Sequence, residues 1–443
     1  MKILILALNY SPELIGVGKY TGELAEWLTA RGHSVRVVTA PPYYPAWRVG
    51  PGHASWRYQA EEIGRAEVLR CPLWVPKAPS ALKRIMHLAS FALSSAVPAL
   101  WRALAWRPDV VWTVEPTIFS APVALLAARL CGARACLHVQ DLELEAALQL
   151  GMISRPRLGR ALRTLHGGLL RRFDLVSTIC QRMRSRLVEL GVADERLCLL
   201  PNWVDTVDIC PLERNGAMRR ALGLRDDQVI ALYAGNMGEK QGLEMLADVA
   251  RRLIDQPEVH LVLCGEGAAR GELERRLEGF PNVTLLPLQP RERLNDLLNM
   301  ADIHVLPQRA EAEHFALPSK LGGMLASGRP VVAQTTGGEL ARAARDCGVA
   351  TAPGDAAAMA RAIADLAADA GRRRRLGRVA RRLAEAWLER DVVLARYESR
   401  LHELTGRWLR APAARTRVTA PGAMGQANAG LAPGTRLSGA LRP

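Results

Sequence analysis

Short apolar runs of strand character alternate with helical segments along most of this 443-residue chain. The run KILILAL (2–8) is continuously apolar, as a strand covered on both faces requires. A loop follows it, then a helical pattern in which Leu24, Trp27 and Leu28 recur at helical spacing, and then a second strand, HSVRVVTAP (33–41). This order predicts an α/β fold with a mostly parallel sheet and helices on both of its faces.

The same pattern starts again after the segment LPNWVDTVDICPLERNG (200–216). Strand candidates then alternate with short helices: QVIALYAG (228–235), VHLVLCGEG (259–267), VTLLPL (283–288), DIHVLPQ (302–308) and RPVVAQT (329–335). We therefore predict two successive α/β halves, joined near residues 203–215. One long helical pattern runs from about 384 to 409, and the Ala-, Pro- and Gly-rich tail after it is expected to be disordered.

The net charge of +15 favours an anionic partner, such as nucleotide phosphates, nucleic acid or an acidic membrane surface, although a general preference for arginine would also produce it. The eight cysteines show no metal-ligand spacing, and we expect reduced thiols in a cytosolic protein. The apolar run 110–131 is interrupted by Glu115, Pro116 and Pro122, which fits a strand and a buried helix better than a membrane span.

The first loop is rich in glycine but does not match a dinucleotide site. Gly16, Gly18 and Gly22 miss the Rossmann fingerprint, which would need glycine at Thr21, and the chain contains no P-loop motif. Gly16 and Gly18 could let backbone N–H groups approach an anion at a helix start, or they could simply form a tight turn. Both interpretations stay open at this point.

Two of the chain's six lysines fall in loops at the predicted ligand edge of the second half. Lys240 lies in AGNMGEKQGLE (234–244) and Lys320 follows ALPS, and both loops come after a strand. Ligands of open α/β sheets bind outside the carboxyl ends of the strands. A cation at a helix start is unfavourable unless an anion binds beside it, so these loops, with CGEG (264–267), predict a nucleotide diphosphate site. The alternative is a pair of solvated lysines.

Six sequence blocks carry a resemblance to a known family. They are NYSPELIGVGKYTGELAEWLTARGHSVRVVTAPPYYP, HVQDLELEAALQLG, LPNWVD, AGNMGEKQGLE, LPLQPRERLNDLLNMADIHVLPQ and LPSKLGGMLASGRPVVA, in this order. Together they resemble glycosyltransferase family 4, in its WcaI-like branch of colanic acid and exopolysaccharide biosynthesis. The similarity covers roughly residues 1–405.

The resemblance implies a GT-B fold, with two Rossmann-like domains facing across a cleft. The implied parts are an acceptor-side domain at 1–205, a donor domain at 206–383, a helix at 384–410 that returns to the first domain, and a basic tail at 411–443. It also implies a retaining hexosyl transfer from a nucleotide-diphosphate sugar to a lipid-linked saccharide, without cofactor or metal. The protein is then expected in the cytoplasm, at the inner face of the cytoplasmic membrane.

The resemblance also assigns site residues. His138 and Asp141, in the strand ACLHVQD, are the candidate catalytic residues, and the alternative for Asp141 is a carboxylate satisfied at a strand end. The predicted donor-binding residues are Gly16, Gly18, Asn236, Gly238, Lys240, Gly265, Glu266, Pro318, Ser319 and Lys320. The chain departs from the broader family in two ways. Asn236 stands where many members carry arginine, and the E-x7-E glutamates fall at Phe315 and Gly323.

Two other functions share parts of this pattern. A nucleotide-sugar epimerase of the same architecture would bind the donor but use no acceptor. A nonenzymatic protein that binds anionic membranes would use the net charge, but its ordered loops would then have no purpose. No nucleic-acid partner is expected. The basic, tryptophan-bearing stretch 82–107 fits either an interfacial surface or a buried helix pair.

Overall fold

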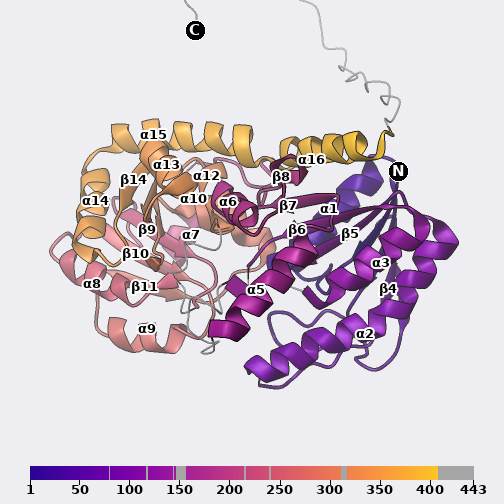
Figure 1. Ribbon diagram of the computed structural model, residues 1–443. Coiled ribbons are helices and arrows are strands. Elements are labelled where there is room, and N and C mark those ends of the chain that lie inside the picture. Colours follow the sequence, from indigo (N-terminus) through magenta and orange to yellow (C-terminus); the bar gives the residue numbers. More distant parts are fainter. Residues whose placement is uncertain are drawn as a thin grey trace, which may run out of the picture. The chain divides into compact units, whose positions relative to one another are not determined.

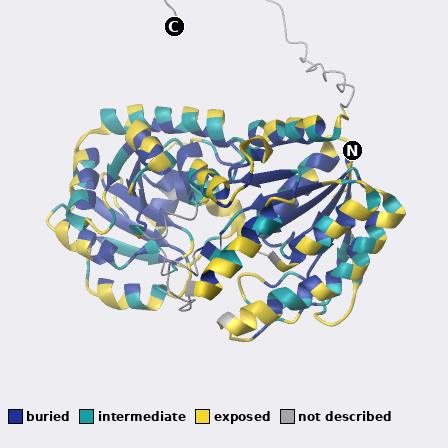
Figure 2. Cartoon of the chain, in the orientation of Figure 1, coloured by how far each residue is buried: buried dark blue, intermediate teal, exposed yellow. Residues whose placement is uncertain are grey.

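The computed structural model contains two sheets, each flanked by helices (Figure 1). Its central strands are buried and its helices expose their outer faces (Figure 2). This confirms the predicted α/β class and the two Rossmann-like halves of a GT-B fold. The described residues are 1–78, 80–115, 118–142, 144–145, 156–213, 216–238, 241–310 and 317–407. The predicted tail and Lys240 lie outside them.

The N-terminal sheet has the strand order β3-β4-β2-β1-β5-β6-β7-β8, and all neighbours are parallel except β3 and β4. Its strands are β1 (Lys2–Leu6), β2 (Ser34–Thr39), β3 (Gln59–Ile63), β4 (Ala66–Arg70), β5 (Val110–Glu115), β6 (Arg134–Val139), β7 (Leu175–Thr178) and β8 (Leu197–Leu199). Its helices are α1 (Gly16–Ala30), α2 (Ala81–Trp106), η1 (Ile118–Ser120), α3 (Ala121–Cys131), α5 (Pro156–Leu170), α6 (Gln181–Glu189) and η2 (Asp194–Arg196).

The C-terminal sheet is parallel throughout, in the order β11-β10-β9-β12-β13-β14. Its strands are β9 (Val229–Ala234), β10 (Val259–Cys264), β11 (Val283–Leu286), β12 (Ile303–Leu306), β13 (Val331–Gln334) and β14 (Gly348–Thr351). The helices of this half are α7 (Gly216–Ala221), α8 (Met245–Arg252), α9 (Arg270–Leu277), η4 (Arg291–Arg293), α10 (Leu294–Met300), α12 (Lys320–Ala326), α13 (Gly338–Cys347), α14 (Ala356–Ala368), α15 (Ala370–Leu383), η5 (Ala384–Leu388) and α16 (Arg390–Thr405).

The central strands form where the sequence is continuously apolar. Every residue of β5, β9 and β10 is buried, because helices cover both faces of the sheet at these positions. All eight cysteines lie in the described ranges and none forms a disulfide. The apolar run that begins at Val110 is a strand followed, after η1, by α3, as predicted.

The predicted continuous helix from about 384 to 409 is interrupted. A π-helical turn at Ala384–Leu388 follows α15, and the chain is extended at Glu389 before α16 begins. Val204, on the earlier connection between the two halves, forms a parallel bridge with Glu389. Its N–H donates to the Leu388 carbonyl (2.8 Å), and its own carbonyl accepts from Arg390 N–H (3.0 Å). The two chain crossings between the halves are therefore hydrogen-bonded to each other.

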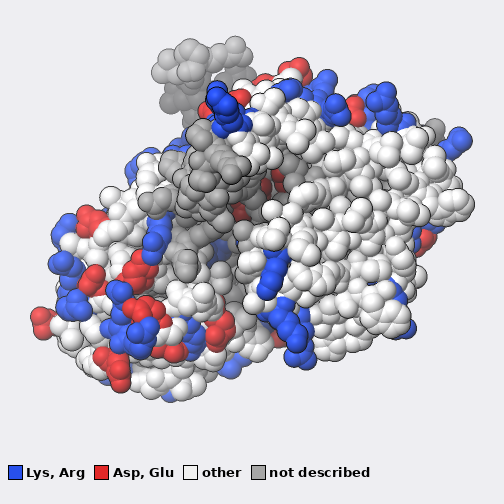
Figure 3. All heavy atoms as spheres, turned by 60° about the horizontal axis from the view of Figure 1, so that its bottom comes forward, with Lys and Arg blue, Asp and Glu red and all other residues white. Residues whose placement is uncertain are grey.

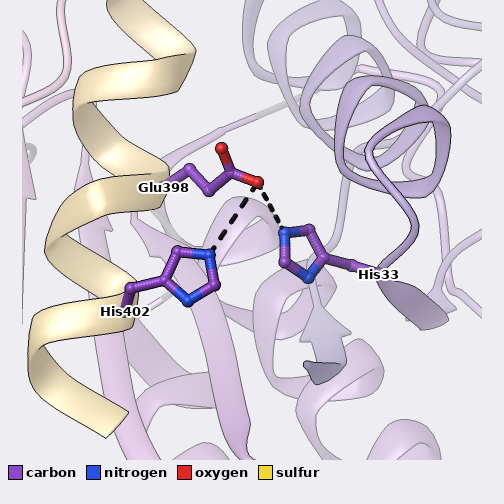
Figure 4. A group of neighbouring side chains, drawn as sticks. All are labelled: His33, Glu398 and His402. Atoms are coloured by element: carbon purple, nitrogen blue, oxygen red, sulfur yellow. Dashed lines mark hydrogen bonds and ion pairs between the residues drawn. The ribbon is translucent and has the colours of Figure 1, made fainter. Parts of the chain in front are cut away.

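Helix α16 is anchored on the N-terminal half. The Trp112 indole N–H donates to the Tyr397 hydroxyl (2.9 Å) in the core of that half. Glu398 Oε1 lies 2.7 Å from His33 Nε2 and 4.0 Å from His402 Nε2 (Figure 4), and Arg31 bonds the other carboxylate oxygen at 3.1 Å. Within the described ranges, this is the one group of side chains spaced to hold a metal ion. The arginine on its carboxylate fits a structural anchor better.

Candidate active site

The loops at the carboxyl ends of β9 and β10 are held together by backbone hydrogen bonds. Gly235 N–H donates to the Cys264 carbonyl (2.9 Å), and Met237 N–H donates to the Glu266 carbonyl (2.8 Å). The close approach of the two loops depends on Gly265. A Cβ at Gly265 would lie 1.9 Å from the Gly235 carbonyl oxygen, and the φ of Gly265 is +154°. These contacts bring together four predicted donor-binding residues: Asn236, Gly238, Gly265 and Glu266.

Lys320, the first residue of α12, reaches this loop from the other side of β9. Its Nζ donates to the Tyr233 hydroxyl (2.6 Å) and lies 4.2 Å from the centre of that ring. The Tyr233 hydroxyl in turn donates to the Asn236 carbonyl (2.5 Å). A Cβ at Gly235 would lie 3.0 Å from Lys320 Nζ, so glycine makes room for the ammonium.

Lys320 is half-buried, and its described surroundings are poor in negative charge. Burial lowers its pKa from 10.5 to about 7, because the charged form loses solvation. Among the described residues, no carboxylate forms an ion pair with it. A partly desolvated ammonium at the carboxyl edge of a parallel sheet is suited to an incoming anion.

Arg309 is a further cation at this edge, and the sequence analysis did not select it. It follows β12, and a Cβ at Gly242 would lie 3.0 Å from its Cγ. Its guanidinium donates to Glu244 Oε1 (2.5 Å), so it is shared with an acid of the neighbouring loop. Its position immediately after the strand run DIHVLPQ (302–308) could have singled it out, because that places it at the ligand edge.

The turn Pro318–Ser319–Lys320 contacts the N-terminal half. The Ser319 side chain lies against the hydroxyl of Tyr20, on α1. Close by, Gln181 N–H of α6 donates to Glu339 Oε2 of α13 (2.8 Å). The predicted donor residues of the C-terminal half therefore lie next to contacts between the two halves.

The glycines of the first loop serve its own packing. Glu13 is buried and accepts from Tyr43 N–H and Tyr44 N–H (3.0 Å each) and from Asn9 Nδ2 (2.9 Å). A Cβ at Gly18 would lie 2.5 Å from Glu13 Oε2, and one at Gly22 would lie 1.9 Å from Ser11 Oγ. Gly16 opens α1 with φ +63°. For Gly18, the structural interpretation of the glycine is sufficient.

The two candidate catalytic residues occupy different environments. His138 lies inside the sheet, with Nδ1 at 3.0 Å from Ser177 Oγ and its ring stacked on Trp112. Burial lowers its pKa to about 3, so the imidazole is neutral. This packing gives His138 no access to a substrate, and the geometry does not support its predicted catalytic role. Asp141 is half-buried just beyond the carboxyl end of β6.

Two more carboxylates lie near the carboxyl ends of β5 and β6. Glu115 ends β5 and its Oε1 lies 2.8 Å from His166 Nε2. Burial is the largest influence on the pKa of His166 and would lower it, but the ion pair with Glu115 and the charge of Glu145 together outweigh burial, and the pKa is raised. Burial would likewise raise the pKa of Glu145, but hydrogen bonds from Arg186 and Arg163 hold it below its usual value. Sequence reasoning missed both pairs because their partners are distant along the chain.

A pocket of about 440 Å³ lies elsewhere, at the amino ends of β12 and β13, where Asp302, Arg329 and Arg373 line it. That is the edge opposite the loops described above. This pocket does not coincide with the loops that carry the predicted donor residues, and the chemistry of Lys320 is the better guide to function.

Comparisons with known proteins agree with this arrangement. Residues 16–203 match the Glycosyl transferase 4-like domain, and residues 228–369 match Glycosyl transferases group 1. The WcaI glycosyl transferase assigned to colanic acid biosynthesis in Escherichia coli (strain K12) is 45% identical over 335 residues, which are 74% of this chain and 82% of that protein.

Two solved structures share the fold. Sucrose-phosphate synthase from Thermosynechococcus elongatus has a TM-score of 0.72 at 18% identity, over 91% of this chain and 99% of that one. Anabaena HepE in complex with UDP-glucose has a TM-score of 0.66 at 16% identity, over 91% and 100%. The two matched domains and the extent of the similarity to WcaI place the chain in a family: it belongs to the WcaI-like glycosyltransferases of the GT-B fold.

Proposed function

We propose that this protein is a retaining glycosyltransferase that moves a sugar from a nucleotide-diphosphate donor to a lipid-linked saccharide in exopolysaccharide biosynthesis. The observation that carries the donor part is Lys320, whose partly desolvated amino group is held at the carboxyl edge of the C-terminal sheet. The name of the WcaI relative supports the pathway class, and the UDP-glucose complex of HepE supports the donor class.

The leaving nucleoside diphosphate gains negative charge as the glycosidic bond to the donor breaks. Lys320 is held by Tyr233 before the substrate arrives, so little reorganisation is needed when that charge develops. Arg309 lies close to the same loop, and Lys240, outside the described residues, belongs to it in sequence. In this scheme the protein's own cations neutralise the diphosphate, and we expect activity without added metal.

Asp141 is the residue we propose to contact the transferred sugar from the N-terminal half. It lies just after β6, at the carboxyl edge of its sheet, and not within the strand. The proposal is a same-face displacement with retention, in which Asp141 contacts the sugar without forming a covalent bond to it. The anomeric configuration of the product, read by NMR, tests the retention, which a double displacement would also give.

The proposal predicts that nucleoside diphosphate is released from a nucleotide sugar only when a polyprenyl-diphosphate-linked saccharide is present. We expect Lys320→Ala to lower kcat/KM by about a hundredfold, the usual cost of losing one preorganised electrostatic group. Lys2→Ala, at the amino end of β1, is the matched control and should retain full activity. Release of an epimerised free sugar without acceptor would show the epimerase alternative instead.

A further inference from the structure

Helix α2 exposes a continuous apolar stripe. Leu93, Val97 and Trp101 follow one another at four-residue spacing and are 78%, 73% and 70% exposed. Leu82, Met86 and Leu104 are also exposed and extend the same stripe toward both ends. The helix has 26 residues and is therefore about 39 Å long. An apolar stripe of this length on one helix is unusual for a surface exposed to water alone.

The opposite face of α2 belongs to the protein core. Phe91, Ala99 and Ala103 are fully buried in the hydrophobic cluster of the N-terminal half, which also contains α3 residues. The helix is long and apolar enough to cross a membrane, and only 22% of its most apolar window is buried inside the protein. Spanning would remove these core contacts, whereas lying in the plane of a membrane surface would keep them. Residues 81–106 form one long helix and not the buried helix pair that was the alternative for this stretch.

Aromatic side chains flank the stripe. The Tyr58 hydroxyl donates to the Ser94 carbonyl on α2 (2.9 Å), and Tyr58 is exposed. Trp74 is exposed as well, and its backbone N–H donates to Ser90 Oγ of α2 (3.1 Å). With Trp101 they form an aromatic set around the helix. Tyr and Trp are enriched where a protein meets the lipid headgroup region, because their rings have both apolar and polar parts.

The charge of this region points to an anionic surface. Between Glu67 and Asp109 the chain contains no acidic residue, while Lys83 and Arg84 are exposed at the start of α2. On the face shown in Figure 3, the half that contains α2 is largely uncharged with a few basic groups, whereas the other half carries many charges of both signs. A second protein would need acids and apolar groups in one matching groove, while an anionic bilayer offers both over any area.

We propose that α2 is a membrane-docking helix, which lies in the interface of an anionic bilayer with the stripe Leu82–Met86–Leu93–Val97–Trp101–Leu104 inserted among the lipids. The inference rests on the helix surface alone and does not depend on the sugar donor or on the glycosyl transfer. It identifies the partner as the bilayer itself, in addition to any lipid-linked acceptor.

Flotation of the full chain with phosphatidylglycerol–phosphatidylcholine vesicles tests the proposal. We expect Val97→Glu with Trp101→Glu to lower the vesicle partition coefficient by roughly tenfold or more, because two apolar insertions are lost. The matched control is Val207→Glu, which changes an equally exposed valine outside α2 (82% exposed) and should bind as the wild type does. Added salt should weaken the wild-type binding, and neutral vesicles should bind less protein.

A second variant guards against misfolding. Lys83→Glu with Arg84→Glu changes only exposed residues at the helix start and should weaken binding to anionic vesicles selectively. Vesicle binding by the Val97→Glu, Trp101→Glu protein at the wild-type level would overturn the proposal. It would also be overturned by a wild-type dimer in size-exclusion chromatography that this variant dissociates, without any vesicle binding, since the stripe would then be an interface between two copies.

Discussion

The first loops of the two halves follow the same strand–loop–helix order, but their glycines have different roles. After β1, a buried carboxylate, Glu13, fills the space that Gly18 leaves free and fixes the loop through backbone N–H groups. After β9, Gly235 and Gly265 leave room for a neighbouring backbone and for the ammonium of Lys320. The first arrangement supplies its own anion, and the second holds a cation that no described carboxylate neutralises.

This difference shows that similar glycine patterns can serve structure in one half and binding in the other. Glycine spacing alone could not separate the two roles. The chemical group that fills the space beside each glycine does separate them. We therefore expect the loop after β9 to bind a ligand and the loop after β1 to have a structural role.

The largest effect is expected from Gly265→Ala. A Cβ there would meet the Gly235 carbonyl oxygen at 1.9 Å, at a φ of +154° that other residues rarely adopt, so we expect a loss of about 3 kcal/mol in unfolding free energy. Donor binding should be lost with it, because the loop at Asn236 must move. Chemical denaturation and nucleotide-sugar titration measure the two effects. A variant that binds the donor normally would remove this loop from the site.

Gly18→Ala should cost less and act on stability only. The new methyl group would lie 2.5 Å from Glu13 Oε2 in a buried loop, and overpacking of this kind costs about 2 kcal/mol. In a Glu13→Ala background the same change should cost clearly less, since the group it meets is gone. A double-mutant cycle measured by denaturation gives the coupling. Strict additivity, or a donor affinity that falls without loss of stability, would contradict the structural role of Gly18.

Tyr233→Phe should have a smaller effect, on donor binding. The ring remains in the core while Lys320 and the Asn236 carbonyl each lose a hydrogen bond, so we expect roughly a fivefold higher donor KM, equivalent to about 1 kcal/mol. Tyr397→Phe is the control, because its hydroxyl is equally buried but bonds Trp112 beneath α16. Equal changes of KM in the two variants would mark the effect as general loss of stability.

The sequence predicts the apolar strands and their order well, because burial on both faces requires continuous runs such as Val229–Ala234. It does not predict β3 and β4, whose half-exposed residues on either side of Gly64 lack such a run. The break at Glu389 was missed because helical periodicity continues across it, while pairing with Val204 is a tertiary contact.

The site was predictable only in part. Lys320 was found from its place after a strand, but its partner Tyr233 lies 87 residues earlier and nothing local connects them. His138 was selected together with Asp141 in the strand ACLHVQD, and the contacts with Ser177 and Trp112 show that its side chain faces the core. Contacts of this kind depend on how strands pair, which periodicity does not specify.

The pH dependence of nucleoside-diphosphate binding tests the central claim most directly. Because burial lowers the pKa of Lys320 to about 7, the free enzyme holds it mostly neutral at pH 8, and a bound diphosphate should recharge it. Affinity should be constant below pH 7 and fall as pH rises above it, with proton uptake seen calorimetrically in buffers of different ionisation enthalpy. Lys320→Ala should bind weakly without proton uptake. Equal affinity and equal proton uptake in both proteins would contradict the account.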